Sequence, residues 1–305
     1  MPAALSMLFA SFAFAAMGAA VKLASSFYST SEIVMYRGII GSLLLLAMIR
    51  HQGGTLRTPF PREHLWRSIV GVVSLWLWFY AISKLPLATA ITLNYMAPIW
   101  LSAYMFLKGW WQGKGLSEWP LIVAVGMSFI GVMLVLRPDA GSDQWLGGAI
   151  AVASSVIAAM AYMQVRRLGQ MGEPEYRVVF YFSLTMVVAG LIGTPFENGF
   201  ATPLHAHDWH GIGLLLAIGI PALMAQMAMT RAYRLGKVLV VANLQYTGII
   251  FSSLWGMILW GDVFGWQVWL GMGVILASGI AATFYNTQRT ARGAVIKDTD
   301  PIASE

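Results

Sequence analysis

The chain has 305 residues, of which 58% are hydrophobic and only 10% are charged. A soluble domain carries about 25% charged residues, so the composition predicts a membrane protein. The net charge of +6 is then explained by basic loops facing the cytoplasm rather than by nucleic-acid binding, and the absence of cysteine excludes disulfides and thiolate chemistry.

Ten apolar runs are each about as long as the roughly 20 residues that a helix needs to cross a bilayer. In chain order they cover residues 4–24, 32–49, 65–83, 87–107, 119–136, 145–165, 178–196, 209–229, 238–260 and 264–285. The runs are continuous rather than alternating, which favours helices over the strands of a barrel. No basic residue precedes Lys22, so the first run is interpreted as a permanent span rather than a signal peptide.

The basic residues divide unequally between the two sides of these spans. With a cytoplasmic N-terminus, four of the 19 basic residues (Lys22, Arg37, Lys84 and Arg137) fall in the outer half, and the other 15 fall inside. By the positive-inside rule this split predicts that both termini face the cytoplasm, in the inner membrane of a bacterium.

The chain also resembles itself at a nearly constant shift. Residues 32–37 align with residues 175–180, and Asn94-Tyr95 aligns with Gln245-Tyr246. With five spans in each half, the second half starts on the opposite side of the membrane. We therefore predict an all-α integral membrane protein of two inverted-topology repeats, residues 1–140 and 141–288, followed by a cytoplasmic tail at 289–305. Such repeats are typical of carriers, although gene duplication without functional consequence is the alternative.

Polar and aromatic residues inside the predicted spans are candidates for a solute site, because they are costly in lipid and tend to face the protein interior. The set is Trp76, Tyr80, Asn94, Tyr95, Ser102, Met160, Tyr162, Gln226, Asn243, Gln245 and Tyr246. Rings and thioethers suit an apolar side chain, and amides suit the two ends of a zwitterion. Ordinary helix packing is the alternative for each residue, and no cofactor is expected.

Three further residues are candidates for gating or bending. Pro98 and Pro221 lie inside predicted spans, where each frees a carbonyl group one turn earlier, so a hinge and a static kink are both open. Arg37 lies near the outer end of the second predicted span. It is interpreted as reaching out to water or pairing with Glu32, with a gate or a substrate carboxylate as alternatives.

Several kinds of chemistry are disfavoured. No Asp or Glu lies in the middle third of a predicted span, so a facilitative carrier is simpler than a proton-coupled one. His205, His207, Asp208 and His210 cluster in a predicted outer loop, where a solvated loop is preferred to a metal site. The sequence has no H-E-x-x-H and no G-x-S-x-G motif, which argues against a membrane-embedded lipid-modifying enzyme, and the inverted repeat argues against a channel.

Glycines on the fifth and tenth predicted spans favour close helix contacts. They are Gly126, Gly131, Gly271, Gly273 and Gly279. A homodimer and packing within one subunit are both open.

Residues 81–90 (AISKLPLATA), the following Tyr95-Met96-Ala97-Pro98 and the second-half stretch 232–237 resemble the drug/metabolite transporter superfamily, in its EamA-type branch. More narrowly, the chain is similar to YddG-type exporters of aromatic amino acids and methionine. The resemblance implies a central cavity lined by spans one to four and six to nine, with spans five and ten peripheral. Pro98 aligns with Ile249, so the two halves need not bend alike. Export of other metabolites or of drug-like cations is the alternative.

Overall fold

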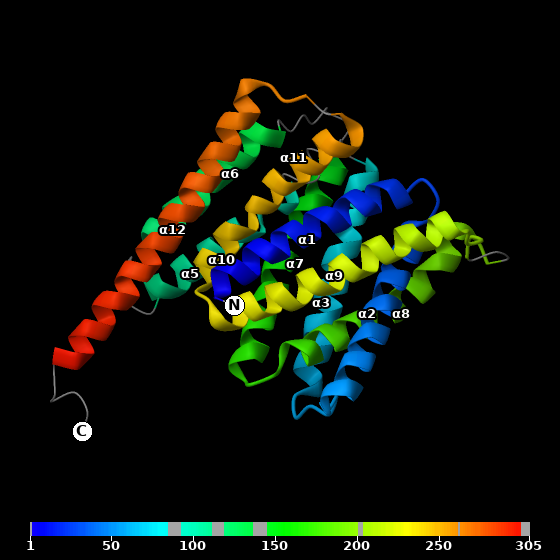
Figure 1. Cartoon of the computed structure of the whole chain (residues 1–305), viewed down its shortest axis with the longest axis horizontal. Helices are drawn as coiled ribbons and strands as arrows, with labels where there is room; N and C mark the ends of the chain where they lie inside the picture. The colour runs from blue at the N-terminus through cyan, green and yellow to red at the C-terminus, as the bar shows by residue number, and fades with distance from the viewer. Residues whose placement is uncertain are drawn as a thin grey trace.

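The computed structural model describes residues 2–84, 93–111, 119–136, 145–200, 204–261 and 263–299, and the regular structure in these ranges is helical (Figure 1). The helices are α1 (Ala3–Ala24), α2 (Thr30–Gln52), α3 (Pro61–Lys84), α5 (Ala97–Trp111), α6 (Trp119–Leu136), α7 (Trp145–Gln170), α8 (Glu175–Asn198), α9 (Trp209–Leu235), α10 (Val238–Gln245), α11 (Thr247–Trp260) and α12 (Trp266–Thr299). The predicted start of the fourth span, most of the stretch 81–90 and the predicted repeat boundary at 140 lie outside the described residues.

The helices follow the predicted apolar runs, with ends shifted by a few residues. Within the described ranges, seven segments are long and apolar enough to cross a membrane, with α10 and α11 forming one of them. The three remaining helices are α3, which carries several charges in its first turns, and α5 and α6, which are 15 and 18 residues long and border undescribed residues. The chain is therefore a multi-pass, all-helical membrane protein.

Helices that are far apart in the sequence pack in pairs. α1 lies along α9, α2 along α8, α3 along α7 and α6 along α12 (Figure 1). Small residues permit the close approach: a Cβ atom at Gly38 would lie 2.7 Å from the carbonyl oxygen of Ser183. Ser74 and Ser154 donate hydrogen bonds to each other's carbonyl oxygens at 3.0 and 2.8 Å, joining α3 to α7. Close packing and interhelical hydrogen bonds of this kind hold helices together in lipid.

The glycines of the fifth and tenth predicted spans have different surroundings. A Cβ atom at Gly271 would lie 2.6 Å from the carbonyl oxygen of Gly131, so this pair serves the contact of α6 with α12 inside one subunit. A Cβ atom at Gly126 or at Gly273 would instead have no heavy atom within 4 Å among the described residues.

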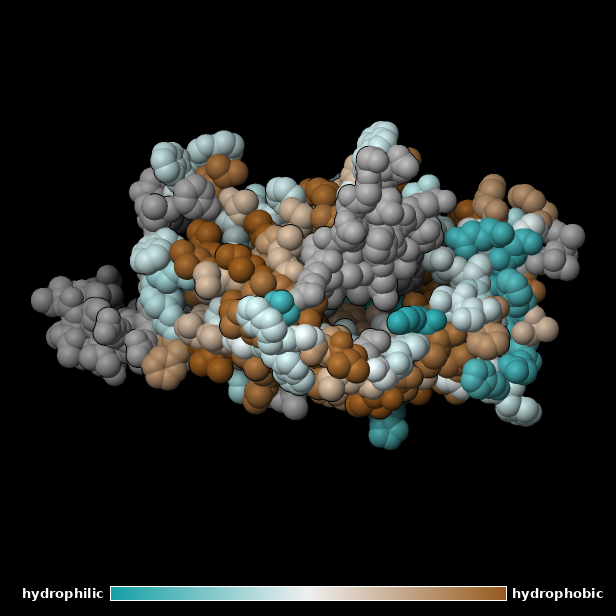
Figure 2. Space-filling view, turned by 90° about the horizontal axis from the view of Figure 1, so that it is seen from above, coloured by the Kyte–Doolittle hydropathy of each residue, from teal (hydrophilic) through white to brown (hydrophobic). Residues whose placement is uncertain are grey.

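The surface fits a bilayer environment. In Figure 2 apolar residues are spread over much of the described surface, and hydrophilic residues are most frequent at one end. Large apolar side chains such as Leu43, Phe196 and Ile280 are more than half exposed, which a soluble monomer rarely shows over a wide area. We call the end with the α7–α8 turn the Glu173 end, and the end with the α1–α2 and α8–α9 turns the His205 end.

The ninth predicted span is broken at Tyr246, which separates α10 from α11. The Thr247 hydroxyl donates to the carbonyl oxygen of Leu244 at 2.7 Å, and such side-chain bonds to the preceding turn bend helices. A turn at Tyr95 and Met96 likewise precedes α5. Both halves therefore have a turn at this place among the described residues, and the turn in the second half contains no proline.

The two prolines have different places. Pro98 lies in the first turn of α5, just after the turn at Tyr95 and Met96, where a proline removes no helical hydrogen bond, so its role as a hinge stays a prediction. Pro221 lies inside α9, which continues on both sides of it.

Candidate functional site

A cavity of about 740 Å³ lies among the helices, within the range of about 300–1,000 Å³ found for small-molecule sites. Its lining comes from α1, α2, α3, α7, α8, α9, α10, α11 and the turn before α5. The paired helices α6 and α12 contribute little to the lining: Val135 comes from α6, and Phe264 lies just before the start of α12. This small share agrees with the peripheral place that the family resemblance implies for the two helices.

The cavity opens toward the His205 end. Among the lining residues, Lys22, Ser25 and Trp260 are exposed and lie at that end, next to the α1–α2 turn and the last turn of α11. Lining residues that lie further in, such as Gln226 and Met229, are buried. Among the described residues, the lining is therefore reached from the His205 end.

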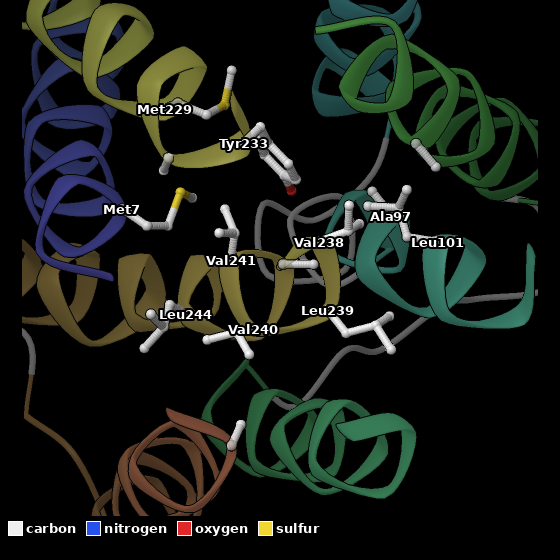
Figure 3. Packing of buried hydrophobic residues seen from close by; sticks show 14 of the residues in the cluster. Met7, Ala97, Leu101, Met229, Tyr233, Val238, Leu239, Val240, Val241 and Leu244 are labelled. Carbon is white, nitrogen blue, oxygen red and sulfur yellow. The ribbon is translucent and has the colours of Figure 1, made fainter. Parts of the chain in front are cut away.

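A cluster of buried apolar residues fills the bundle between the cavity and the Glu173 end. Residues of α1, α5, α9 and α10 make up much of it, with others from α6, α7 and α12. Figure 3 labels Met7, Leu101, Met229, Tyr233, Val238, Leu239, Val241 and Leu244 among them. Because close-packed side chains leave no path for water, this cluster closes the Glu173 end.

Two tyrosine pairs lie where this cluster meets the cavity. The rings of Tyr162 and Tyr233 stack with their centroids 5.3 Å apart, and those of Tyr95 and Tyr246 stack at 6.1 Å. Gln245 donates a hydrogen bond to the Tyr162 hydroxyl at 3.0 Å. The floor of the cavity is thus aromatic, with an amide fixing one of its rings.

The structure brings some of the sequence-predicted residues to the cavity. Those in its lining are Arg37, Asn94, Tyr95, Tyr162, Gln226 and Gln245. They come from α2, α7, α9, α10 and the turn before α5, so residues distant in the sequence converge here.

The other predicted residues lie elsewhere. Tyr80 and Met160 are 45% and 47% exposed, Trp76 packs against the cluster around Phe182, and Ser102 donates to the carbonyl oxygen of Pro98 at 2.8 Å. Asn243 is bonded to Ser128 and Ser278, joining α10 to α6 and α12. Tyr246 is fully buried behind Tyr95. A span that is apolar all round does not reveal which face meets a cavity.

The preferred interpretation of Arg37 is wrong. Arg37 neither reaches outward nor pairs with Glu32: it is 6% exposed and lines the cavity. Glu32 instead lies in the first turn of α2, where it forms a capping box with Ser29 and accepts hydrogen bonds from the backbone and ring of His205, both at 2.7 Å. The helix start captures the Glu32 side chain, which leaves Arg37 facing the interior.

Arg67 is a cavity residue that the sequence analysis missed, because it was counted among the basic residues of the inner side. It is 2% exposed and lies in the lining, with its guanidinium carbon 4.5 Å from the centre of the Phe182 ring. Its Nε and Nη1 have no hydrogen-bond partner among the described residues. An arginine inside a predicted span was the signal.

The charge of the lining has one sign. Lys22, Arg37 and Arg67 are cationic, and the described lining contains no Asp or Glu. Lys22 lies 4.0 Å from the centre of the Trp260 ring at the open end, whereas Arg37 and Arg67 are buried further in. The cavity is therefore electropositive and partly aromatic.

The histidines of the α8–α9 turn form contacts within the protein. His205 pairs with Glu32, His207 bonds to the hydroxyls of Tyr28 and Tyr36, and Asp208 caps α9 through the backbone of Gly211. Burial, and next the charges of Asp208 and Glu32, raise the pKa of Tyr28. Among the described residues, no group of three or more His, Cys, Asp or Glu is placed to hold a metal ion.

A second carboxylate cluster lies at the Glu173 end. The buried Glu173 accepts hydrogen bonds from His64 at 2.9 Å, from Arg177 at 3.0 Å and from Thr58 at 2.9 Å. Burial raises the pKa of Glu173, but these donors and the charge of Arg177 outweigh it, so the pKa lies below its usual value. Arg167 and Glu63 form an ion pair at 3.1 Å nearby. These contacts join α3 and the preceding loop to α7 and α8.

Known proteins are similar to this chain in sequence and in fold. Residues 1–137 match the model of the EamA-like transporter family. The pseudopaline exporter CntI of Pseudomonas aeruginosa is 34% identical over 258 residues, covering 83% of this chain and 86% of the exporter. A riboflavin transporter of Vibrio cholerae is 26% identical over 301 residues, covering 95% of each chain.

A solved crystal structure superposes on 94% of this chain and 98% of its own with a TM-score of 0.76, at 18% identity. This likeness concerns the fold. The relatives named for a substrate are named for pseudopaline or riboflavin, so the comparisons support the broader resemblance and not the narrower one to YddG-type exporters.

Proposed function

The chain belongs to the EamA-like transporter family, and from this premise we propose that it exports small amino-acid-type solutes from the cytoplasm by alternating access. The family is one of transporters, so a membrane-embedded enzyme is set aside. The observation that carries the proposal is a cavity with aromatic rings, amides and cations in one lining, open at one end and closed at the other. Aromatic amino acids and methionine are the first substrates to test.

The helix pairs support the prediction of ten spans in two inverted repeats. If each span corresponds to the span five places later, the pair α1–α9 corresponds to α7–α3, and the pairs α2–α8 and α6–α12 correspond to themselves. These are the pairs with the most extensive contacts. The turns at Tyr95 and Tyr246 are equivalent in the same scheme. Exchange of the two packings would then open the other end of the cavity.

The basic residues support a cytoplasmic Glu173 end. Arg57, Arg62, Arg166, Arg167 and Lys237 lie in or beside the turns at that end, as the positive-inside rule expects for the cytoplasmic side of a bacterial inner membrane. The cavity then faces outward in this structure. The lack of a carboxylate in the described lining supports a facilitative carrier over one that moves protons through a buried acid.

The charge of the lining also bears on the substrate. Drug-like cations are disfavoured, because Lys22, Arg37 and Arg67 would repel them. Other metabolites are a second candidate class, supported by relatives named for pseudopaline and riboflavin. Riboflavin therefore belongs in the substrate panel beside the amino acids.

The test is uptake into liposomes that contain the purified protein, with labelled tryptophan, phenylalanine, tyrosine, methionine and riboflavin, and empty liposomes as the control. Saturable uptake that the unlabelled solute competes would support a carrier. Tyr95→Ala and Tyr246→Ala are expected to slow uptake several-fold, because they remove one stacked pair of the cavity floor. Tyr104→Ala, at a 48% exposed position on α5, is the matched control and is expected to behave as the parent protein.

No uptake of any of these solutes by folded protein would overturn the proposed substrate class. Uptake that proceeds unchanged in both Tyr95→Ala and Tyr246→Ala would remove the tyrosine floor from the transport path.

A further inference from the structure

The inner part of the cavity contains two arginines without an anionic partner in the described part of the chain. Arg37 comes from α2 and Arg67 from α3, and both are more than nine-tenths buried. Arg67 leaves Nε and Nη1 without a hydrogen-bond partner, while the face of its guanidinium group lies against Phe182. Two buried donors of Arg67 are therefore unsatisfied within the described residues.

Two such side chains carry a cost that the empty protein does not offset. Arg37 lies near the start of α2 and Arg67 near the start of α3, in both cases inside the helix. A buried charge inside a membrane span is disfavoured, and a second cation in the same lining adds to this cost. The described acids close to the cavity are engaged elsewhere: Glu32 pairs with His205, and Glu173 pairs with His64 and Arg177. Within the described residues, the negative charge that would balance the two arginines is therefore left for a substrate to supply.

A simple amino acid supplies too little of it. The single carboxylate of a zwitterion can satisfy one arginine, and its ammonium group adds a positive charge to a lining that already has three cations. A solute with two carboxylates matches the two arginines, and a guanidinium edge binds a carboxylate through two parallel hydrogen bonds.

We propose that the substrate of this carrier is a dicarboxylate with an aromatic or apolar arm, whose two carboxylates bind Arg67 and Arg37. Phe182 holds the Arg67 guanidinium in position, and the arm lies against Tyr95 and Tyr162 in the cavity floor. The amides of Asn94, Gln226 and Gln245 accept hydrogen bonds from an amine that joins the carboxylates. This inference rests on the proposed transport function and narrows its substrate class.

The test uses two probes that differ by one carboxylate, phenylalanine and N-(carboxymethyl)phenylalanine. Binding is measured as the rise in melting temperature of the full-length protein in detergent across a range of probe concentrations, and transport is measured as uptake into proteoliposomes. The dicarboxylate is expected to bind the parent protein about tenfold more tightly than phenylalanine does, as one additional charge-assisted contact allows.

Arg67→Met and Arg37→Met are expected to lose this preference and to bind the two probes about equally. Because a buried unpaired charge is replaced by an apolar chain of similar length, both variants should fold and melt at or above the temperature of the empty parent protein. Arg50→Gln removes a charge from an exposed position at the end of α2 and should keep the preference.

Equal binding of the two probes by the parent protein would overturn the proposal, and so would a preference that survives in both Arg67→Met and Arg37→Met. A lower melting temperature of the empty Arg67→Met protein would also count against it, because the arginine would then be structural. A retained dicarboxylate preference without uptake of either probe would overturn the transport function alone and leave the binding site standing.

Discussion

The two ends of the molecule contain the same pair of groups in different surroundings. At the Glu173 end, Glu173 and His64 lie 2.9 Å apart, and their side chains are 2% and 1% exposed. At the His205 end, Glu32 and His205 lie 2.7 Å apart, but the histidine is 51% exposed while the glutamate is fully buried. Each pair joins the first half of the chain to the second, so the pair is dry at one end and half hydrated at the other.

The difference shows how one kind of contact can serve both a closed and an open end. A carboxylate removed from water needs donors on all sides, and Glu173 obtains them from His64, Arg177 and Thr58 together. Glu32 obtains its donors from the cap of its own helix and from His205. The Glu173–His64 pair is therefore buried on both sides, and we call it the latch, whereas water can reach the Glu32–His205 pair through the histidine.

The largest effect is expected for Glu173→Gln. The change leaves the Arg177 charge without its carboxylate in a buried place, and breaking a buried pair in this way costs about 3–5 kcal/mol. Thermal unfolding in detergent would show a large drop in melting temperature, with Glu197→Gln as a control for loss of a carboxylate at the other end. A melting temperature equal to that of the parent protein would mean that the two ends do not differ as described.

A pH profile sharpens the same comparison. The pKa of folded Glu173 is below its usual value, so its contribution to stability is fully present above the unfolded pKa of about 4.3. That contribution is lost as the pH falls through the lower, folded pKa. Melting temperatures measured between pH 6 and pH 3 should therefore fall more steeply below about pH 4 for the parent protein than for Glu173→Gln. Parallel curves for the two proteins would contradict the latch.

The sequence predicts the helices well, because apolar runs mark the segments that lie in lipid and basic turns mark the segments that lie in water. It does not predict the break at Tyr246. The Thr247 hydroxyl donates a hydrogen bond to the carbonyl oxygen of Leu244 there, but a threonine inside a helix usually makes no break. Pro98 in the first half is a sequence signal for a break, but it lies in the first turn of α5, just after the equivalent turn.

The sequence predicts only part of the candidate site. Asn94, Tyr162 and Gln245 are polar groups inside apolar runs, and they lie in the cavity. Tyr80 and Met160 satisfy the same criterion but are largely exposed, because an apolar span gives no sign of which face meets lipid. The sequence alone does not mark Arg67 as a cavity residue, because the positive-inside rule also explains an arginine near a span end.

A smaller effect is expected for Glu32→Gln at the open end. The glutamine can still accept a hydrogen bond from the backbone of Ser29, while the link to the half-exposed His205 weakens. The loss should be about 1 kcal/mol, as for a changed helix cap, and the melting temperature should fall far less than for Glu173→Gln. A drop as large as that of Glu173→Gln would show that both ends are latched in this state.

The smallest effect is expected for Tyr246→Phe in the floor between the two ends. The Tyr246 hydroxyl is buried and has no hydrogen-bond partner among the described residues, so its removal should leave the stability unchanged or raise it by up to about 1 kcal/mol. Tyr162→Phe is the matched control, because its hydroxyl accepts a hydrogen bond from Gln245 at 3.0 Å, and this loss should cost about 1 kcal/mol. A loss of stability in Tyr246→Phe equal to that in Tyr162→Phe would mean that the Tyr246 hydroxyl has a partner, such as a water molecule from the cavity. The dry boundary would then lie closer to the Glu173 end than the tyrosine floor.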